Sequence, residues 1–171
     1  MTSGPNDLSQ KSGPPLGFAR HDHAHCVESG LSAADARCAS EGLRLTAVRR
    51  KVLEILLQEH RAVGAYAILD RLREDGFSSQ PPVAYRALDF LVANGLAHKI
   101  ERLNAFIACA HPDEAHAPAF MICRLCDAVA EAQSSPARAL GEAARATGFV
   151  IERTVVEAEG VCPACTEKAA S

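Results

Sequence analysis

Cys123-Arg124-Leu125-Cys126 is the first of two C-x-x-C pairs, and Cys162-Pro163-Ala164-Cys165 follows it after thirty-five residues. Each pair lets two thiolates point from one tight turn into one site, and two pairs complete the tetrahedron of sulfur ligands that Zn²⁺ prefers. Two disulfides or a redox dithiol are the alternatives. Either would fit a single pair, whereas two pairs in a chain expected to lack a secretion signal favour a structural zinc, bound by all four cysteines.

The composition is typical of a cytoplasmic protein with one large domain or two small ones. The chain has 171 residues, of which 48% are hydrophobic and 5% aromatic, enough to build a core. No apolar run approaches the ~18 residues of a membrane span, and residues 1–20 lack the apolar segment of a signal peptide. The 7 cysteines are therefore expected to be thiols or metal ligands.

The distribution of charge suggests nucleic acid more than the net charge of −3 does. Residues 43–103 carry ten Lys/Arg against seven Asp/Glu, a net of +3, whereas residues 104–171 carry five against nine, a net of −4. A basic middle segment suits a phosphate backbone.

The middle of the chain has the pattern of a winged helix-turn-helix. Apolar residues recur at helical spacing over residues 47–58, 65–75 and 83–91, and Thr46 is a good N-cap for the first of these helices. The pattern then changes to that of two strands, 96–101 and 105–109, joined by a turn. Such a fold places its last helix in the major groove and its hairpin wing along the DNA backbone. An ordinary small α+β domain is the alternative.

The C-terminal third is predicted to form a small α/β unit. Residues 118–122 and 128–131 have the pattern of strands that enter and leave the first C-x-x-C, a helix capped by Ser134 or Ser135 follows, and residues 149–156 form the longest strand. That strand is apolar enough to need a partner, so we expect it at a dimer interface. The predicted fold is α+β, with a disordered tail (1–25), a winged helix-turn-helix DNA-binding domain (26–110), a hinge (111–117) and an α/β dimerisation domain (118–171).

A second set of ligand-type residues surrounds the first C-x-x-C and is spread over three predicted elements. Its members are His98, Cys109, His111, His116 and Glu131. A metal bound by such a set would tie those elements together. Near the N-terminus, His21, His23, His25 and Cys26 could bind a metal or simply lead into a helix. Val27, Leu31, Ala34 and Cys38 follow at helical spacing, and the sequence leaves open whether Cys38 binds metal.

Several of these stretches resemble the ferric uptake regulator (Fur) family, over roughly residues 40–166. They are Leu43-Arg44-Leu45-Thr46 opening a helix, residues 82–91 (Pro-Val-Ala-Tyr-Arg-Ala-Leu-Asp-Phe-Leu), His98-Lys99-Ile100-Glu101 and the two C-x-x-C pairs. The resemblance implies a homodimeric, metal-dependent repressor that binds operator DNA. It implies no enzymatic activity, no small-molecule substrate and no membrane.

The resemblance also implies which residues form the sites. Cys123, Cys126, Cys162 and Cys165 match the family's structural zinc site, and Tyr85 and Arg86 match residues that meet DNA. The sensing site of the zinc-responsive members falls on His98, Cys109, His116 and Glu131. The implied protein binds about two Zn²⁺ per chain, one structural and one regulatory. It represses zinc-uptake genes when the regulatory zinc fixes the angle between its domains.

This chain departs from the family pattern at two places. Val83 stands where the family usually has threonine, so a hydroxyl contact to the DNA backbone is missing. The loop between Cys109 and His116 is a residue shorter, so His111 competes with His116 as the hinge ligand, although ligand reach favours His116.

Other functions remain as alternatives. A family sensor of iron, manganese or peroxide is the first, and Cys109 argues against it because a thiolate beside imidazole and carboxylate suits Zn²⁺. A zinc deaminase would need H-x-E and P-C-x-x-C, which this chain does not match. An iron-thiolate electron carrier would be red, and a zinc protein is colourless.

Overall fold

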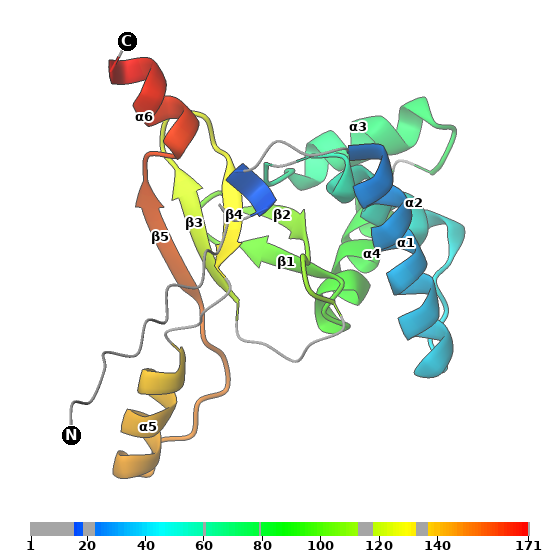
Figure 1. Cartoon of the computed structure of the whole chain (residues 1–171). Helices are drawn as coiled ribbons and strands as arrows, with labels where there is room; N and C mark the ends of the chain where they lie inside the picture. The colour runs from blue at the N-terminus through cyan, green and yellow to red at the C-terminus, as the bar shows by residue number, and fades with distance from the viewer. Residues whose placement is uncertain are drawn as a thin grey trace, which may run out of the picture.

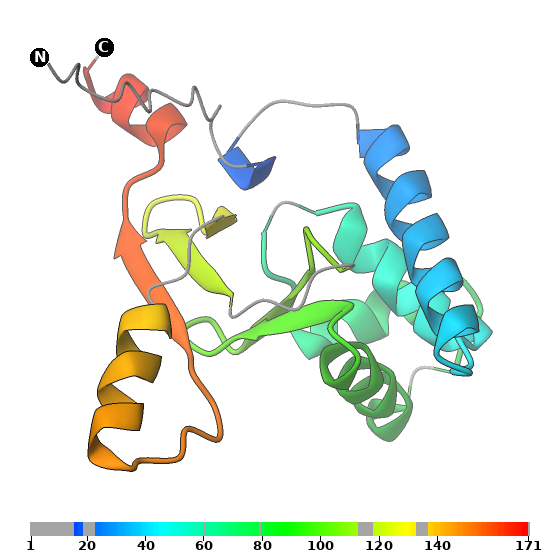
Figure 2. The same cartoon turned by 60° about the horizontal axis from the view of Figure 1, so that its bottom comes forward.

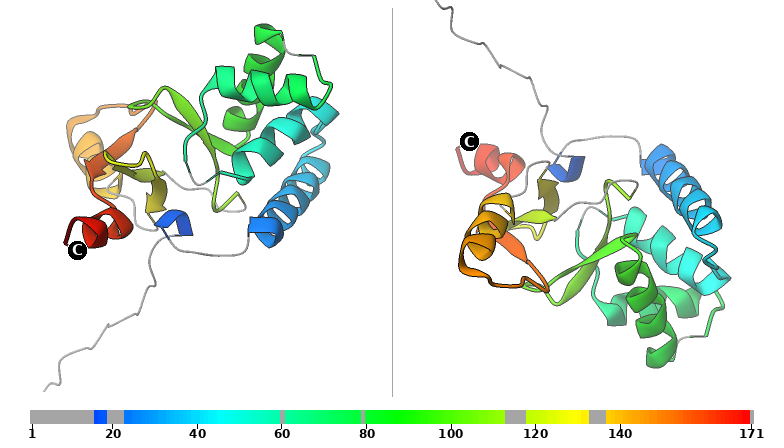
Figure 3. Two further views of the ribbon diagram at one scale, coloured as in Figure 1. Left: turned by 90° about the horizontal axis from the view of Figure 1, so that it is seen from above. Right: turned by 90° about the horizontal axis from the view of Figure 1, so that it is seen from below.

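The computed structural model describes residues 16–18, 23–59, 61–78, 80–112, 118–132 and 137–170. Their elements form two groups with a β-hairpin between them (Figure 1), and the two views in Figure 3 show the same separation. The helices are α1 His23–Ser40, α2 Ala47–Leu57, α3 Ala65–Glu74, α4 Pro81–Ala93, α5 Ala137–Thr147 and α6 Pro163–Ala170, with a 3₁₀ helix η1 at Leu16–Phe18. The strands are β1 Ala97–Ile100, β2 Ala105–Ala108, β3 Ala119–Cys123, β4 Val129–Ala132 and β5 Val156–Gly160. None of the described helices is long and apolar enough to cross a bilayer.

Helices α1 to α4 share one apolar core with the base of the hairpin. Thr46 caps α2 as predicted, because its hydroxyl oxygen accepts the N–H of Arg49 at 3.4 Å. Asn94 and Gly95 end α4, and Gly95 has a φ of 66°, which favours glycine. The large side chains that are fully buried in this core are Val52, Ile55, Leu56, Ile68, Leu72, Leu88 and Leu91. Each stabilises the fold by roughly 1.5–3 kcal/mol.

The second group is a three-stranded sheet in the order β4-β3-β5. Strand β3 is antiparallel to β4 and parallel to β5. Its inner face packs on the hairpin, where Ile100 of β1 meets Phe120, Ile122 and Val129 in a small second core. The sheet therefore contacts the helical group mainly through the hairpin.

The prediction of a long strand over residues 149–156 is wrong, because only its last residue, Val156, belongs to a strand. Strand β5 begins at Val156 and continues to Gly160, while residues 149–155 are irregular. Phe149 and Val150 are 68% and 80% exposed. This apolar segment has no neighbouring strand among the described residues, so β-propensity alone does not make it one. Figure 2 shows α5 and this segment on the side of the molecule away from α1–α4.

Both ends of the chain contain structure that the sequence patterns did not predict. Helix α6 begins inside the second C-x-x-C, with Pro163 as its first residue, where a short tail was expected after residue 166. Helix α1 begins at His23, before the expected end of the tail at residue 25. Segment η1 packs against β4, and a Cβ at Gly17 would lie only 2.2 Å from the carbonyl oxygen of Val129. Ser134 and Ser135, the predicted helix caps, lie outside the described residues.

Candidate metal centres

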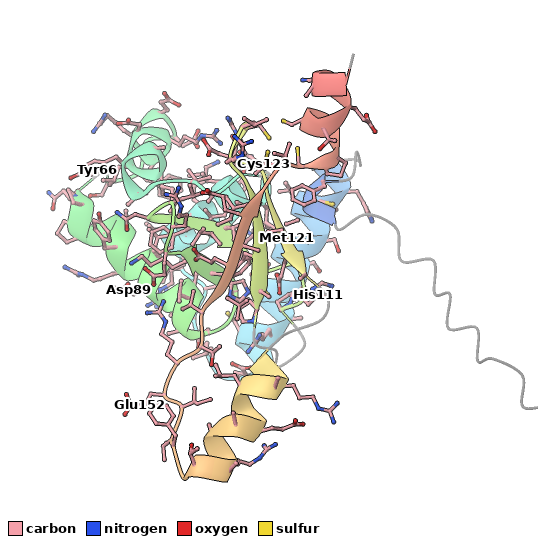
Figure 4. All side chains as sticks on the ribbon, turned by 90° about the vertical axis from the view of Figure 1, so that its left-hand side faces the viewer. Tyr66, Asp89, His111, Met121, Cys123 and Glu152 are labelled. Atoms are coloured by element: carbon pink, nitrogen blue, oxygen red, sulfur yellow. The ribbon has the colours of Figure 1, made fainter. Side chains whose placement is uncertain are left out.

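The four paired cysteines come together at one end of the sheet. Strands β3 and β5 are parallel neighbours with Cys123 opposite Gly160, so the first pair begins where β3 ends and the second begins just beyond β5. Figure 4 shows Cys123 at this end, beside the start of α6. The four sulfur atoms lie within 4.8 Å of one another.

The spacing of these sulfur atoms fits zinc and does not fit a disulfide. Cys126 Sγ and Cys162 Sγ are 3.7 Å apart. Tetrahedral ligands at a Zn–S distance of ~2.3 Å are about 3.8 Å apart, whereas a disulfide bond is about 2.05 Å long. All seven cysteines are free thiols in the structure. The geometry thus matches the predicted four-sulfur site.

The thiols of this cluster have different pKa values. The backbone N–H of Cys162 donates to Cys123 Sγ at 3.3 Å and is the main reason why the pKa of Cys123 is lowered to about 6. Hydrogen bonds to the side chains of Cys162 and Cys126 raise the pKa of Cys165 to about 12. Cys123 therefore gives up its proton to a bound cation more readily than Cys165 does.

A second cluster joins the hairpin to the sheet. His98 lies on β1, Cys109 directly follows β2 and Glu131 lies on β4, and one ligand atom from each lies within 4.8 Å of the others. The side chains of His98 and Glu131 are only 13% and 6% exposed, with His98 Nε2 3.9 Å from Glu131 Oε2. The same oxygen accepts the N–H of Ala110 at 3.2 Å. A nitrogen, a sulfur and a carboxylate oxygen so arranged suit Zn²⁺.

Local structure determines where these donors point. The β1–β2 pairing sets His98 opposite Ile107, and the N–H of Cys109 donates to the Leu96 carbonyl at 3.0 Å, so both ligands lie at the open end of the hairpin. The ring of Phe120 lies 5.4 Å from that of His98 and limits its rotation. Sequence reasoning missed this role of Phe120, because an apolar residue in a strand carries no signal that it faces a ligand.

The remaining candidate ligands are placed differently. His116 lies outside the described residues, so three of the four predicted sensing ligands are seen together. His111 is described and does not belong to their cluster. In Figure 4 it lies well away from Cys123.

Of the N-terminal candidates, Cys26 and His25 belong to neither cluster, while the side chain of His23 is not among those that the structure describes. Cys26 lines a cavity of about 120 Å³ with Cys109 and Glu131, yet its sulfur is not within the cluster. Cys38 is buried in the helical core and has a packing role. His25 is exposed, and His21 lies outside the described residues.

Helix α4 presents the two residues predicted to meet DNA. Tyr85 and Arg86 are exposed, while Ala84, Ala87 and Leu88 on the opposite side of the helix are buried. Val83, the first residue of the apolar pattern over residues 83–91, is only half-buried. An exposed Tyr-Arg pair on the last helix before the hairpin is the arrangement expected of a recognition helix.

Known proteins are similar to this chain in sequence and in fold. The chain is 38% identical over 139 residues to the zinc uptake regulation protein of Escherichia coli strain K12, covering 80% of this chain and 81% of that protein. It belongs to the zinc uptake regulators of the Fur family. The family membership predicted from the motifs is thereby confirmed. No family model matches the chain.

Solved structures of zinc uptake regulators agree with the fold. A zinc uptake regulator complexed with zinc and DNA matches with a TM-score of 0.80 and 37% identity, over 85% of this chain and 98% of that one. Holo XcZur matches with a TM-score of 0.74 and 40% identity, over 81% and 98% of the two chains. Apo XcZur matches with a TM-score of only 0.50, at 39% identity over 83% and 99%. The arrangement of this chain is therefore more similar to holo than to apo XcZur.

Proposed function

We propose that this protein is a zinc-responsive repressor of zinc-uptake genes, which binds operator DNA as a homodimer when zinc occupies the site of His98, Cys109 and Glu131. The observation that carries the proposal is the position of this site. Two of its donors belong to the hairpin that follows the recognition helix, and the third belongs to the sheet. A metal bound there links the part that reads DNA to the part that dimerises.

The domain division supports a simple mechanism. We propose a winged-helix domain over residues 26–110, a hinge over 111–117 that supplies His116 as the fourth ligand, and a dimerisation domain over 118–171, after a tail over 1–25. Zinc fixes the angle between the domains in both protomers, which sets the two recognition helices about one helical turn of DNA, ~34 Å, apart. The closer match to holo than to apo XcZur supports this mechanism.

The energies involved are compatible with such a switch. Shifting a two-state equilibrium from 1:99 to 99:1 requires a ligand to favour one state by about 5.5 kcal/mol. Structural zinc binds small peptides with roughly 10–16 kcal/mol, so a three- or four-ligand site can supply this difference. In zinc-free protein the two domains become ordered only when it binds DNA. Because this ordering costs entropy, zinc-free protein binds DNA weakly.

The remaining features complete the proposal. The four cysteines hold a structural zinc, giving about two Zn²⁺ per chain. Leu140, Phe149, Val150 and Val155 are exposed apolar residues of α5 and the segment before β5, and they form part of the dimer interface. Tyr85 and Arg86 contact the operator. The protein works in the cytoplasm, where the operator is, and catalyses no reaction.

The test is a DNA-binding titration at buffered free zinc, combined with metal analysis of the purified dimer. Duplex DNA selected by the protein from a random library at saturating zinc serves as the probe. We expect affinity to rise steeply with zinc and to respond less to Fe²⁺ or Mn²⁺ at matched free concentrations. Binding that ignores zinc, or that follows iron or manganese instead, would overturn the proposal.

A further inference from the structure

The turn of the hairpin is bound by a carboxylate from β5. Residues 101–104 connect β1 to β2, and the backbone N–H groups of Glu101 and Arg102 donate to the two oxygens of Glu157, at 2.6 and 2.9 Å. Hydrogen bonds to an ionised acceptor are about twice as strong as neutral ones, and successive N–H groups of a turn form a natural anion-binding site. The N–H groups that a wing tip could offer to DNA phosphates are therefore used by the protein itself.

Charged side chains on both sides of this contact are complementary. Arg102 Nη2 lies 2.7 Å from Glu159 Oε2, and Arg153 pairs with Glu101. These pairs are largely exposed, so each stabilises the contact little on its own. Together they pair each charge of the turn with an opposite charge, Arg102 with Glu159 of β5 and Glu101 with Arg153 of the segment before β5.

The register of the sheet explains why Glu157 faces the hairpin. Glu157 and Glu159 of β5 lie opposite Phe120 and Ile122 of β3 in the parallel ladder. Residues opposite each other in a ladder point to the same face of the sheet. Phe120 and Ile122 are buried against the hairpin, so the same face continues onto β5 as two carboxylates. Acidic residues also protect an edge strand from unwanted pairing, but that role does not require the two hydrogen bonds that Glu157 makes.

The hairpin is thus held at both ends. At its open end lie His98 and Cys109, beside Glu131 of β4, and at its turn lies Glu157 of β5. Four residues of strand at ~3.3 Å each separate these ends by about 13 Å. A single anchor leaves the hairpin free to pivot, whereas two anchors fix its direction. Only three residues lie between the end of α4 and the start of β1, so the orientation of α4 follows that of the hairpin.

We propose that Glu157 is a positioning residue for DNA recognition: by holding the turn of the hairpin, it sets the orientation in which zinc, bound at the other end, presents α4 to DNA. The inference rests on the proposed function and adds to it a residue that touches neither metal nor DNA. When Glu157 is replaced, zinc still brings the domains together, but α4 no longer has the orientation needed to bind DNA.

The experiment compares Glu157→Ala and Glu157→Gln with a charge-matched control, Glu152→Ala. Glu152 lies in the irregular segment before β5 (Figure 4), and its replacement removes the same charge from the same domain. Each full-length dimer is titrated with the selected duplex and with an unrelated duplex, at saturating zinc and without zinc. Zinc content, dimerisation and amide exchange of Glu101 and Arg102 are measured on the same samples.

The direction of the change in DNA affinity distinguishes a positioning role of Glu157 from the mere loss of a negative charge. Losing a negative charge generally strengthens binding to DNA, so Glu152→Ala should bind the selected duplex at least as well as the parent. Glu157→Ala should bind it about tenfold more weakly at saturating zinc, since it loses charge-assisted hydrogen bonds. Its zinc content and its binding of the unrelated duplex should not fall. Glu157→Gln keeps one acceptor oxygen and should show a smaller loss. The amides of Glu101 and Arg102 should exchange faster in Glu157→Ala.

The failures are distinguishable. If the parent responds to zinc while Glu157→Ala binds like Glu152→Ala, or if the two amides stay protected without Glu157, the inference is overturned and the proposed function stands. If the parent shows no zinc-dependent binding, the proposed function is overturned and the inference with it.

Discussion

Replacing Cys109 by serine tests the sensing site most directly, because the change is small and the lost chemistry is large. Cys109 is 7% exposed, and serine fits its space. The backbone hydrogen bond to Leu96, 3.0 Å long, does not involve the side chain, so the hairpin should persist. A hydroxyl, unlike a thiol, does not ionise near neutral pH and is a poor zinc ligand.

The magnitude follows from the role of the residue. Loss of a group that merely supports a ligand costs about 10–100-fold in metal affinity. Loss of a ligand itself should cost at least the upper value, about 100-fold or roughly 2.8 kcal/mol. This is about half of the ~5.5 kcal/mol that the switch requires. We expect half-maximal DNA binding to need about 100-fold more free zinc, and the variant to carry about one zinc per chain instead of about two.

The assay is fluorescence anisotropy of a labelled duplex across zinc buffers, with metal content measured by mass spectrometry. Cys38→Ser is the matched control, because it makes the same change at a buried site in the helical core. Cys26→Ser makes it beside the cluster, in the same cavity as Cys109. Both should keep the parent's midpoint. A parent-like midpoint for Cys109→Ser would exclude Cys109 from the sensing site, and a shift in Cys26→Ser would assign the role to Cys26.

Further expectations concern the other sites. Cys162→Ser should unfold or monomerise the C-terminal part, because a small domain depends strongly on its metal; a folded dimer with full zinc content would exclude this site. Arg86→Ala should lose about 1–3 kcal/mol of preference for the selected duplex, and Tyr85→Phe less; equal losses on selected and unrelated DNA would make Arg86 a phosphate contact. Phe120→Ala should destabilise the protein by about 3–5 kcal/mol in denaturant unfolding, and a change below ~1 kcal/mol would contradict the buried contact.

Local sequence patterns are sufficient for much of this fold. Thr46 and the apolar spacing after it predict α2, because capping and helical periodicity depend on residues only three or four positions apart. The change of period after Gly95 predicts the hairpin in the same way. The spacing of the two C-x-x-C pairs predicts the four-sulfur cluster. Each pair is itself a local structure, so the fold has only to bring the two pairs together around one site.

The strand expected over residues 149–156 shows where local patterns fail. A strand exists only where another backbone offers hydrogen bonds, and within the described chain that neighbour is β3, which pairs with residues 156–160. The cluster of His98, Cys109 and Glu131 likewise depends on contacts between distant parts of the chain. His98, Cys109 and Glu131 belong to three elements, and spacing alone did not separate them from His111 or Cys26.

The linear pattern therefore predicts helix α2, the hairpin, the four-sulfur cluster and the family motifs, because these depend mainly on short-range spacing. The convergence of three ligands at one end of the hairpin, and of Glu157 at the other, arises only when the sheet packs on the hairpin. Those contacts join residues up to 56 positions apart, and burial and register in the packed chain decide them.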